Sequence, residues 1–484
     1  MKHTSSDIHR TRPRRFASGA IKGALAVIAW LAIWQVASLA LANPWLLSSP
    51  VDTLSVWASL ILTGHFWEAV THSLARIALG FVVAFVAGCA LGYLAARLPG
   101  MRTFLKPAVL AVKSAPVVCI IALLLVAAGS NATTSIVVGL VVFPQFYHAV
   151  MEAALSRDTD IDEMLDVFGV PRARRALCVE LVAFGASIRS ATAVAAGLAW
   201  KSGVAAEIIG LPGLSIGESV YLAKISLDSA TIIAWTATVI LLSWLSEKLL
   251  LALVDASMGM PKRWLAARVR RVTKASCESQ NSSESMPPAC GLIVEGLTRD
   301  YGTDGAGPLL RYADLHVPAG ARLCVMAPSG AGKTTLLRMA AGIERPDAGT
   351  VAHDGMHEPP MGVVLQDCTL VPWASTLENI ALVANDESEL RRGLHMCRAV
   401  LDEKDLARPA RALSGGMSRR AELCRALAHP SSLVVLDEPF SGLDAATKAR
   451  CVDLVNQELD GRTLIIASHD EDDAIALGCD VVRL

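Results

Sequence analysis

Long apolar segments in the first half of the chain constrain its fold more than any other feature. Six segments between residues 21 and 254 are apolar over about 20 residues, the length that a helix needs to cross the core of a bilayer. They are residues 23–42, 74–96, 107–128, 134–154, 190–211 and 231–254. Because lipid offers the backbone no hydrogen-bond partners, such segments are expected to be helical. The sequence therefore predicts that residues 1–260 form an all-α domain of six transmembrane helices in a lipid bilayer.

The first apolar segment can also be interpreted as a cleaved signal peptide. Arg12, Arg14 and Arg15 precede it, and Ala40-Leu41-Ala42 resembles a cleavage site. Its apolar run of about 20 residues is longer than the ~7–15 residues of a signal-peptide core. We therefore expect an uncleaved helix.

Basic residues predict the orientation of these helices. Lys and Arg are absent from the first loop, residues 43–73, and occur in every second connection: residues 2–22, 97–106, 157–175 and 262–274. Loops rich in Lys and Arg stay in the cytoplasm. The pattern thus places both ends of this multi-pass domain in the cytoplasm.

The long fourth loop has an amphipathic pattern. Between residues 158 and 181, apolar and charged residues alternate as two short helices would require, with a break at Gly169-Val170-Pro171. Such a loop either lies on the lipid surface or packs on a neighbouring domain. We expect it to pack on the domain that follows in the chain.

The composition changes again after residue 260. Residues 261–290 are first basic and then rich in Ser and Glu, with Pro287-Pro288 near the end. This stretch offers little apolar surface to bury, which predicts a flexible tether. Residues 291–484 have ordinary charge density and form the second domain. The net charge of −1 gives no sign of nucleic-acid binding, and the eleven scattered cysteines give no sign of a disulfide framework.

A phosphate-binding loop is predicted near the start of the second domain. Residues 322–326 indicate a buried strand, and the glycine-rich run after it leads into a helix that starts near Thr334. Loop N–H groups and a helix amino terminus attract phosphate oxygens. In this loop Lys333 would contact the β- and γ-phosphates, and Thr334 would bind Mg²⁺. The ATP-binding candidates here are Ser329, Gly330, Gly332, Lys333, Thr334 and Thr335. Ala327 replaces the usual first glycine, and we expect a small effect.

Two further buried strands end in polar residues. Residues 433–436 lead into Asp437 and Glu438, and residues 463–467 lead toward His469. Ligands bind at the carboxyl ends of the strands in open α/β sheets. Asp437 suits a Mg²⁺ site, and Glu438 suits a base that polarises the attacking water. The alternative is that these carboxylates form structural ion pairs.

The complete series of motifs resembles an ATP-binding cassette (ABC) ATPase over residues 291–484. The series is 329–335, Gln366, 413–416, 433–438, 441–444 and His469. This resemblance implies an α/β P-loop NTPase domain with a helical subdomain, and ATP and Mg²⁺ as cofactors. It implies that Tyr301 stacks on adenine, that Gln366 senses Mg²⁺ and water, and that His469 contacts the γ-phosphate. Ser414, Gly415 and Gly416 would bind the γ-phosphate of the opposite subunit, with Asp444 at the seam of a homodimer.

The first domain resembles the permeases of the nitrate, taurine and aliphatic-sulfonate importers. The resemblance rests on residues 47–50 and 73–81, and residues 370–373 and Met417 of the ATPase resemble the same group. Glu163-Met164-Leu165 followed by Gly169 resembles the coupling loop of binding-protein-dependent importers, although its two alanines are replaced. Val182 stands where that family usually has proline.

The resemblances together imply ATP-driven transport. The expected protein is an importer half-unit, with permease and ATPase fused, in the bacterial inner membrane with a cytoplasmic ATPase. It would homodimerise and take up a small anionic solute, such as nitrate or a sulfonate, from an extracytoplasmic solute-binding protein. An exporter half-transporter and a membrane-anchored ATP sensor are the alternatives.

Lys201 is the one hint about cargo. It lies inside the fifth apolar segment, where an unpaired charge is costly. It lines a pathway for anions, pairs with Glu207, or extends its side chain to the outer membrane surface.

Overall fold

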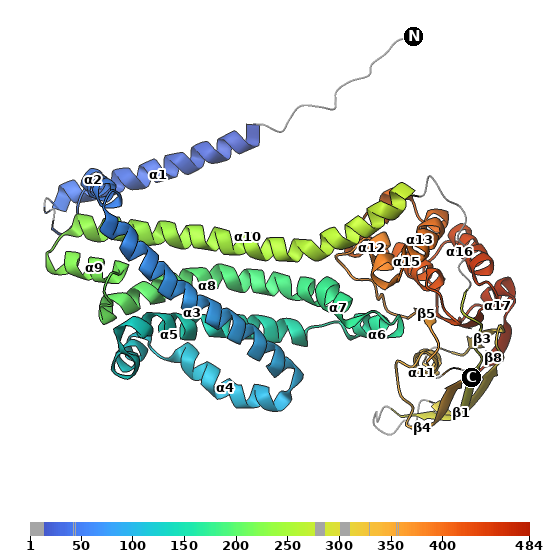
Figure 1. Cartoon of the computed structure of the whole chain (residues 1–484). Helices are drawn as coiled ribbons and strands as arrows, with labels where there is room; N and C mark the ends of the chain where they lie inside the picture. The colour runs from blue at the N-terminus through green and yellow to red at the C-terminus, as the bar shows by residue number, and fades with distance from the viewer. Residues whose placement is uncertain are drawn as a thin grey trace, which may run out of the picture. The chain divides into compact units, whose positions relative to one another are not determined.

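The computed structural model describes residues 14–41, 43, 45–275, 286–300, 310–328, 330–354, 356 and 358–484. The chain divides into two compact units, which Figure 1 shows with their element labels. The membrane unit comprises residues 1–155 and 184–255. The ATPase unit comprises residues 156–183 and 256–484, so it includes the fourth loop and the end of the last long helix.

The described part of the membrane unit is helical. Its helices are α1 (Arg14–Leu41), α2 (Pro50–Ile61), α3 (Gly64–Arg97), α4 (Pro99–Ser114), α5 (Val117–Leu155), α8 (Leu181–Gly210), α9 (Ile216–Ile225) and α10 (Ser229–Ala275). Within the described ranges, four helical stretches are long and apolar enough to cross a membrane: Gly64–Arg97, Val117–Leu155, Arg172–Gly210 and Ser229–Lys274. A shorter apolar stretch, Leu25–Leu41, belongs to α1. The predicted helical fold of this region is therefore confirmed, with four rather than six helices of membrane-spanning length among the described residues.

The third predicted span, residues 107–128, is not one helix. Helix α4 ends at Ser114, and Ala115 is extended (φ −70°, ψ 137°) because it precedes Pro116. Helix α5 is then interrupted at Gly129, whose φ of 73° and ψ of 171° lie outside the helical region. The prediction of a single span was wrong because it gave apolar composition more weight than Pro116, whereas the break at Gly129 agrees with the predicted gap between the third and fourth spans.

Close packing of α3 against α5 forms much of the membrane unit's interior. At Gly80 of α3 a Cβ atom would lie 2.3 Å from the carbonyl oxygen of Ser135, and at Gly92 it would lie 2.5 Å from that of Tyr147. Only glycine allows backbones to approach so closely, as at other interfaces between membrane helices. These glycines therefore bring α3 and α5 together.

The fourth loop forms two helices separated by a turn, as its pattern predicts. Helix α6 (Thr159–Val167) ends in a Schellman motif, in which Val170 N–H donates to Leu165 O and Gly169 N–H donates to Asp166 O. Gly169 has a φ of 61°, which a glycine adopts without strain. Helix α7 (Arg172–Arg175) and a π-helical turn (Ala176–Glu180) then lead into α8.

The ATPase domain contains two sheets. The first is antiparallel with strand order β2-β1-β4, and the second is parallel with strand order β5-β6-β7-β3-β8. The strands are β1 (Leu292–Arg299), β2 (Leu310–Val317), β3 (Arg322–Met326), β4 (Ala348–His353), β5 (Met361–Val364), β6 (Leu433–Asp437), β7 (Thr463–Ala467) and β8 (Asp480–Arg483). Strands β5, β6, β7 and β3 are almost wholly buried, which explains their continuous runs of apolar residues.

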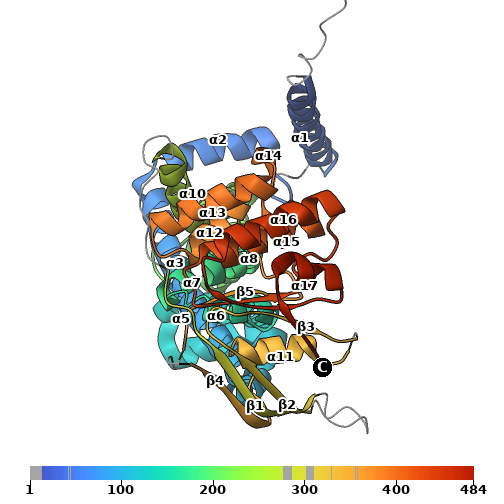
Figure 2. The same cartoon turned by 90° about the vertical axis from the view of Figure 1, so that its right-hand side faces the viewer.

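Helices pack around the parallel sheet. Those that lie between β5 and β6 in the sequence, α12 to α15, form a helical subdomain. The helices are α11 (Lys333–Ala340), α12 (Thr376–Val383), α13 (Glu387–Val400), α14 (Glu403–Leu406), α15 (Gly415–Ala428), α16 (Ala445–Glu458) and α17 (Glu471–Leu477). Figures 1 and 2 show α12, α13 and α15 together, away from β1 and β4. The predicted α/β ATPase with a helical subdomain is therefore confirmed.

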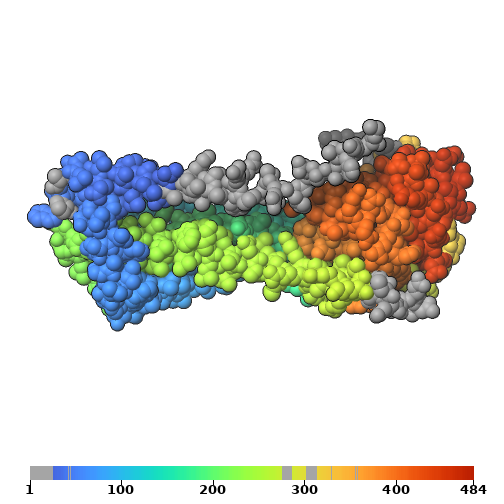
Figure 3. Space-filling model, turned by 90° about the horizontal axis from the view of Figure 1, so that it is seen from above, coloured from blue at the N-terminus to red at the C-terminus, as the bar shows by residue number. Residues whose placement is uncertain are grey.

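Residues 261–275 are helical, although their composition predicted part of a flexible tether. They continue α10 into the ATPase unit, where Leu265 and Val272 are buried in its main hydrophobic cluster and Val269 packs against that cluster. The spacing of these three residues places them on one face of the helix. In Figure 3 the yellow-green end of α10 lies beside orange residues of the ATPase. Hereafter residues 256–275 are called the α10 extension.

Candidate ATP site and its connections

The order of the parallel strands brings the predicted chemical groups together. In the series β5-β6-β7-β3, Gln366 follows β5, Glu438 follows β6, His469 follows β7 and the glycine-rich loop follows β3. All four strands are parallel, so their carboxyl ends share one side of the sheet. We call this side the nucleotide edge.

The phosphate-binding loop leads directly into α11. Gly330 and Gly332 have φ angles of 83° and 93°, and Gly332 is the amino-terminal cap of the helix. Lys333 is buried and its Nζ donates to the carbonyl oxygens of Ala327 at 2.5 Å and Pro328 at 3.3 Å. Thr335 is also buried.

Ala327 is not among the described residues with positive φ, so its backbone does not require glycine. Ser329 lies outside the described residues.

Oxygen ligands gather beside this loop. The Oγ1 of Thr334 donates to the Oε1 of Gln366 at 3.2 Å. Asp437 is buried at the end of β6, and its Oδ2 has no hydrogen-bond partner within the part of the chain that the structure describes. Burial raises the pKa of Asp437, with Glu438 adding repulsion, while the nearby Thr334 hydroxyl and the charges of Arg419 and Lys333 oppose the rise. Mg²⁺ prefers a hydroxyl and carboxylates or amide oxygens arranged in this way, so these residues fit the ion.

Glu438 has a strained backbone. Its φ is 46°, in the left-handed region, and such a conformation costs of order 1–3 kcal/mol for a residue other than glycine. Its N–H donates to the carbonyl oxygen of Ala467 at 3.0 Å, which fixes Glu438 against the end of β7. Its carboxylate lies 3.6 Å from Nδ1 of His469, whose side chain is 70% exposed. The two side chains are therefore paired at the open nucleotide edge.

The signature segment 413–416 lies at the surface. Ser414 is exposed and caps α15, where its side chain accepts a hydrogen bond from Met417 N–H. A Cβ atom at Gly416 would lie 3.1 Å from Leu443, so the signature segment lies beside the turn that ends at Asp444. Asp444 is exposed, and it caps α16 by accepting from Thr447 N–H at 3.0 Å.

The structure therefore separates the predicted site residues into two groups. Among the described residues, no hydrogen bond or ion pair joins the signature segment to Lys333 or Glu438. Gly415 is exposed with open space around its Cα. Tyr301 lies outside the described residues.

Three charged residues of α15 that the sequence analysis did not identify hold the segment around Gln366. Arg419 donates to the carbonyl oxygens of Leu365 and Gln366. Glu422 accepts from Thr369 N–H at 2.6 Å, and Arg425 donates to Thr369 O at 2.9 Å. Glu422 and Arg425 are almost completely buried. Charged residues on a helix ordinarily indicate a solvated face, so the sequence gave no sign of this arrangement.

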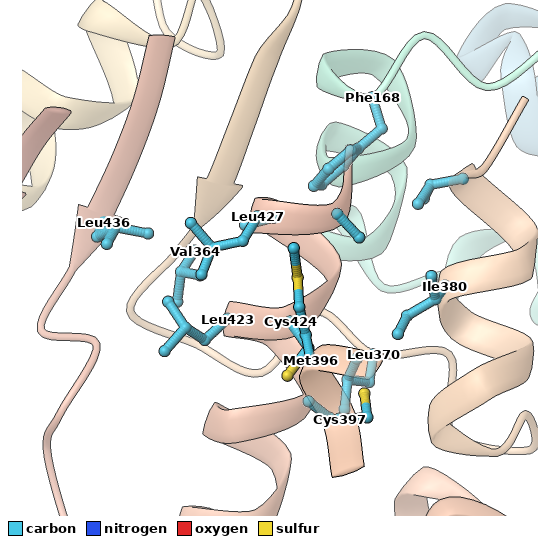
Figure 4. Close-up of a cluster of buried hydrophobic side chains, with 14 of the residues drawn as sticks. Phe168, Val364, Leu370, Ile380, Met396, Cys397, Leu423, Cys424, Leu427 and Leu436 are labelled. Carbon is cyan, nitrogen blue, oxygen red and sulfur yellow. The ribbon is translucent and has the colours of Figure 1, made fainter. Parts of the chain in front are cut away.

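Phe168 of the fourth loop packs on α15. It is 3% exposed, and the guanidinium carbon of Arg425 lies 5.2 Å from the centre of its ring. The ring of His429 meets it edge-on at 5.1 Å. Figure 4 shows Phe168 extending toward the cluster that contains Leu427 and Cys424. Arg425 thus contacts both the fourth loop and the segment that follows Gln366.

A second contact of the fourth loop reaches the helix of the phosphate-binding loop. Glu163 of α6 forms an ion pair with Arg338 of α11 at 2.5 Å, and both side chains are partly buried. Arg174 of α7 donates to the carbonyl oxygens of Leu382 and Ala384 at the end of α12. The expectation that the fourth loop packs on the ATPase is therefore confirmed within the ATPase unit. We call the contacting surfaces of α11, α12 and α15 the docking face.

In the membrane unit, Glu207 pairs with Arg76 rather than with Lys201. The Arg76 guanidinium lies 3.6 Å from the Glu207 carboxylate, which also accepts from Ser73 at 2.7 Å and from Gly217 N–H at 3.2 Å. Glu207 is fully buried, whereas Lys201 is exposed and forms no ion pair with any described residue. A Lys201–Glu207 pair is therefore excluded because Arg76, distant in sequence, already neutralises the carboxylate.

An open cavity of about 840 Å³ lies between α3 and α5. Its walls are mostly apolar, from residues such as Leu79, Val83 and Leu140, and Arg76 and Asn131 supply polar groups. Lys201 is not one of its lining residues.

Comparisons with known proteins agree with the site. Residues 310–441 match the family model described as ABC transporter. The aliphatic sulfonates import ATP-binding protein SsuB 1 of Rhizobium johnstonii is 36% identical over 214 residues, 42% of this chain and 75% of the relative. The SsuB 2 protein of Agrobacterium fabrum is 36% identical over 206 residues, 41% of this chain and 79% of the relative.

Two further similar proteins are an iron-import ATP-binding protein and a cassette of known structure. The Fe(3+) ions import ATP-binding protein FbpC of Mesorhizobium japonicum is 36% identical over 206 residues, 39% of this chain and 56% of the relative. A solved dimeric ATP-binding cassette with bound ADP and Pi is 25% identical and covers 40% of this chain and 94% of that chain, with a TM-score of 0.37.

The fold, the site and the similarity to the SsuB proteins define an ATPase of the cassette class. The chain belongs to the ABC transporter family. It binds ATP and hydrolyses it in support of transport. Its apolar helices make it a membrane-associated protein with a cytoplasmic ATPase.

Proposed function

We propose that the chain is the fused half-unit of an ATP-driven importer, with residues 1–260 as permease and residues 291–484 as ATPase. Two copies would form the transporter in the bacterial inner membrane, as a multi-pass protein with both termini in the cytoplasm. The observation that carries this proposal is the packing of the fourth loop on the ATPase. Glu163 pairs with the phosphate-loop helix, and Phe168 lies against Arg425 beside the Gln366 segment.

At the nucleotide edge we propose distinct roles for the grouped residues. Lys333, Gly330, Gly332, Thr335 and the surrounding loop bind the phosphates. Thr334 and Gln366 would hold Mg²⁺, with Asp437 behind them, and the ion would neutralise phosphate charge. Glu438 polarises the attacking water, and His469, 3.6 Å away, contacts the γ-phosphate.

The exposed signature segment supports a homodimer. Ser414, Gly415 and Asp444 are accessible and have no described contact with the Lys333 loop. In a symmetric pair, the signature of one copy would complete the site of the other. Each site would then bind ATP only when both copies contribute.

The cargo that we propose is a small anion, delivered by an extracytoplasmic solute-binding protein. The names of the relatives point in different directions, to aliphatic sulfonates and to Fe(3+). A cassette supplies energy rather than cargo contacts, so the membrane unit is the better guide. Lys201 is a cation without a described ion-pair partner on a helix long enough to span the membrane.

An exporter half-transporter is the second candidate, and the length of α10 favours it. This helix runs for 47 residues and continues into the ATPase unit, as an extended intracellular helix would.

Transport direction separates the two candidates. Cells would co-express the chain with solute-binding proteins encoded beside its gene, and accumulation of labelled ethanesulfonate and nitrate would be measured. An importer raises the internal label above that of Glu438→Gln cells. An exporter lowers it, and a non-transporting sensor leaves it unchanged. Either of the last two results contradicts the proposal.

A further inference from the structure

The carboxyl end of α12 receives two arginines from different parts of the chain. Arg174 of the fourth loop donates to Leu382 O at 3.0 Å and Ala384 O at 2.9 Å. Arg268 of the α10 extension donates to Ala381 O at 2.8 Å and twice to Ala384 O at 3.2 Å. The two guanidinium groups therefore share the Ala384 carbonyl. We call these carbonyl groups the α12 socket.

The chemistry of a helix end explains why the socket attracts cations. The last four carbonyl groups of a helix have no partner inside the helix. They also carry the negative end of the helix dipole, which favours a positive charge. Guanidinium presents several N–H donors in one plane, so a single Arg268 can bridge Ala381 and Ala384.

Arg268 belongs to a docked helix and is not an isolated contact. Leu265 and Val272, which flank it on the α10 extension, are at most 1% exposed in the ATPase cluster. Lys262 lies over the ring of Trp373 at 5.6 Å. The extension thus buries an apolar face along its length. Removal of these side chains from water stabilises the docked helix.

The socket is connected rigidly to the nucleotide edge. Helix α12 begins with a capping box between Ser375 and Glu378. The buried Asn379 accepts from Val371 N–H at 2.7 Å and donates to Val371 O and Ala374 O. These bonds tie α12 to the chain that runs on from Gln366. A displacement of α12 is therefore transmitted to that segment.

We propose that the α10 extension is a second coupling element, which engages the ATPase through the α12 socket beside the fourth loop, with Arg268 as its positioning residue. This inference rests on the proposed function, in which nucleotide binding drives the membrane helices. Helix α10 runs from Ser229 to Ala275 with Pro261 inside it, so the chain of the socket contact continues, through a helix that lacks one internal hydrogen bond, into a candidate membrane-spanning helix.

The test uses the full chain in lipid nanodiscs and needs no cargo. Hydrogen–deuterium exchange is measured with and without AMP-PNP and Mg²⁺ in the wild type, Arg268→Ala, Arg268→Lys and Arg271→Ala. Arg271 is the matched control, since its side chain is 68% exposed and its nearest acidic partner, Glu387, lies 3.9 Å away. Lysine retains the positive charge at position 268 but lacks the planar guanidinium group, which can donate several hydrogen bonds at once.

In the wild type and Arg271→Ala, nucleotide should change exchange both in residues 330–340 and in the membrane segments 64–155 and 229–255. In both Arg268 variants the membrane response should fall to about half or less, while residues 330–340 respond normally. Arg268→Lys keeps the positive charge, which makes it the milder variant. If buried residues of the ATPase exchange at the wild-type rate in this variant, its fold is intact.

Two results contradict the inference in different ways. A wild-type membrane response in both Arg268 variants would show that the α10 extension transmits nothing through the socket. A wild type whose membrane segments do not respond to nucleotide would instead refute the coupling that the proposed function assumes.

Discussion

The nucleotide edge and the docking face belong to the same ATPase domain but differ in how exposed their polar groups are and in which groups these contact. At the edge, Gln366 and His469 are exposed, as is Ser414 of the separate signature segment, and the buried Asp437 keeps one oxygen without a hydrogen-bond partner in the described structure. At the docking face, Arg174 of the fourth loop and Arg425 of α15 donate to carbonyl groups of the same chain, although Arg425 Nε has no hydrogen-bond partner among the described residues.

This difference shows what each surface is for. In the proposed function, the open groups at the edge take a nucleotide, a metal ion or a second copy as partners. The groups of the docking face contact the fourth loop of the same chain. Substitutions at the edge should therefore remove chemistry and leave stability unchanged, whereas substitutions on the docking face should change coupling or stability and leave the chemistry in place.

Glu438→Gln should have the largest effect. ATP affinity should be unchanged, because the phosphate loop is intact, while hydrolysis should fall by about 10²–10⁴-fold through loss of the general base. Steady-state hydrolysis and nucleotide binding are measured together. Glu471→Gln is the control, since Glu471 is exposed and pairs only with Arg483 among the described residues. A rate within threefold of the wild type would refute the assigned role.

Glu163→Arg should uncouple the docking face. The substitution places two positive charges where an ion pair of 2.5 Å now joins α6 to α11, so uptake should be abolished while basal hydrolysis remains largely intact. Combining it with Arg338→Glu restores opposite charges and should recover transport.

Gly169→Pro should have the same uncoupling effect, since proline cannot adopt the φ of 61°. Normal uptake in both single variants would show that this contact is not a coupling contact.

His429 should make the docking face sensitive to acid. Burial, with Arg462 and Arg392 nearby, lowers the pKa of His429 to about 4, and these effects outweigh the attraction of Glu389 at 3.9 Å. The folded chain then binds fewer protons than the unfolded chain between pH 4 and about 6.5. The stabilising contribution is complete above pH 6.5 and is lost as pH falls toward 4, by at most about 3 kcal/mol.

Denaturant unfolding from pH 7 to 4.5 measures this loss. His429→Gln should flatten the dependence on pH, with the remaining slope from groups such as His353, whose pKa burial also lowers. An unchanged slope would mean that His429 does not titrate with folding.

Lys201→Met should have the smallest effect. If Lys201 lines the anion pathway, uptake of ethanesulfonate should decrease severalfold, while ATP binding and dimerisation stay unchanged. Glu218→Gln, on the short helix α9, provides a control of similar chemistry in the same unit. Undiminished uptake would leave Lys201 without a role in cargo transfer.

The nucleotide edge could be predicted from the sequence because its chemistry depends on local order. Glycine spacing around Lys333 and the residues that follow each buried strand determine it, and the parallel sheet then aligns them. The docking face could not be predicted in the same way. Arg425 and Arg268 donate hydrogen bonds to residues more than 50 positions away in the sequence, and no local sequence pattern reveals such contacts.

In two places a local signal was present but was given too little weight. Pro116 divides the third predicted span. Leu265, Val269 and Val272 have helical spacing in a stretch whose average composition predicted a tether.

Mixing two inactive chains tests most directly whether the open edge is completed by a second copy. Lys333→Ala removes one face of the site and Ser414→Arg removes the other, so each variant alone should be inactive. A mixed dimer keeps one site with both faces intact, and an equal mixture should regain up to roughly a quarter of wild-type hydrolysis if the copies pair randomly. Recovery on mixing, together with a dimeric mass for the wild type, is the predicted result. No recovery, or full activity of an isolated monomer in detergent, would contradict the account.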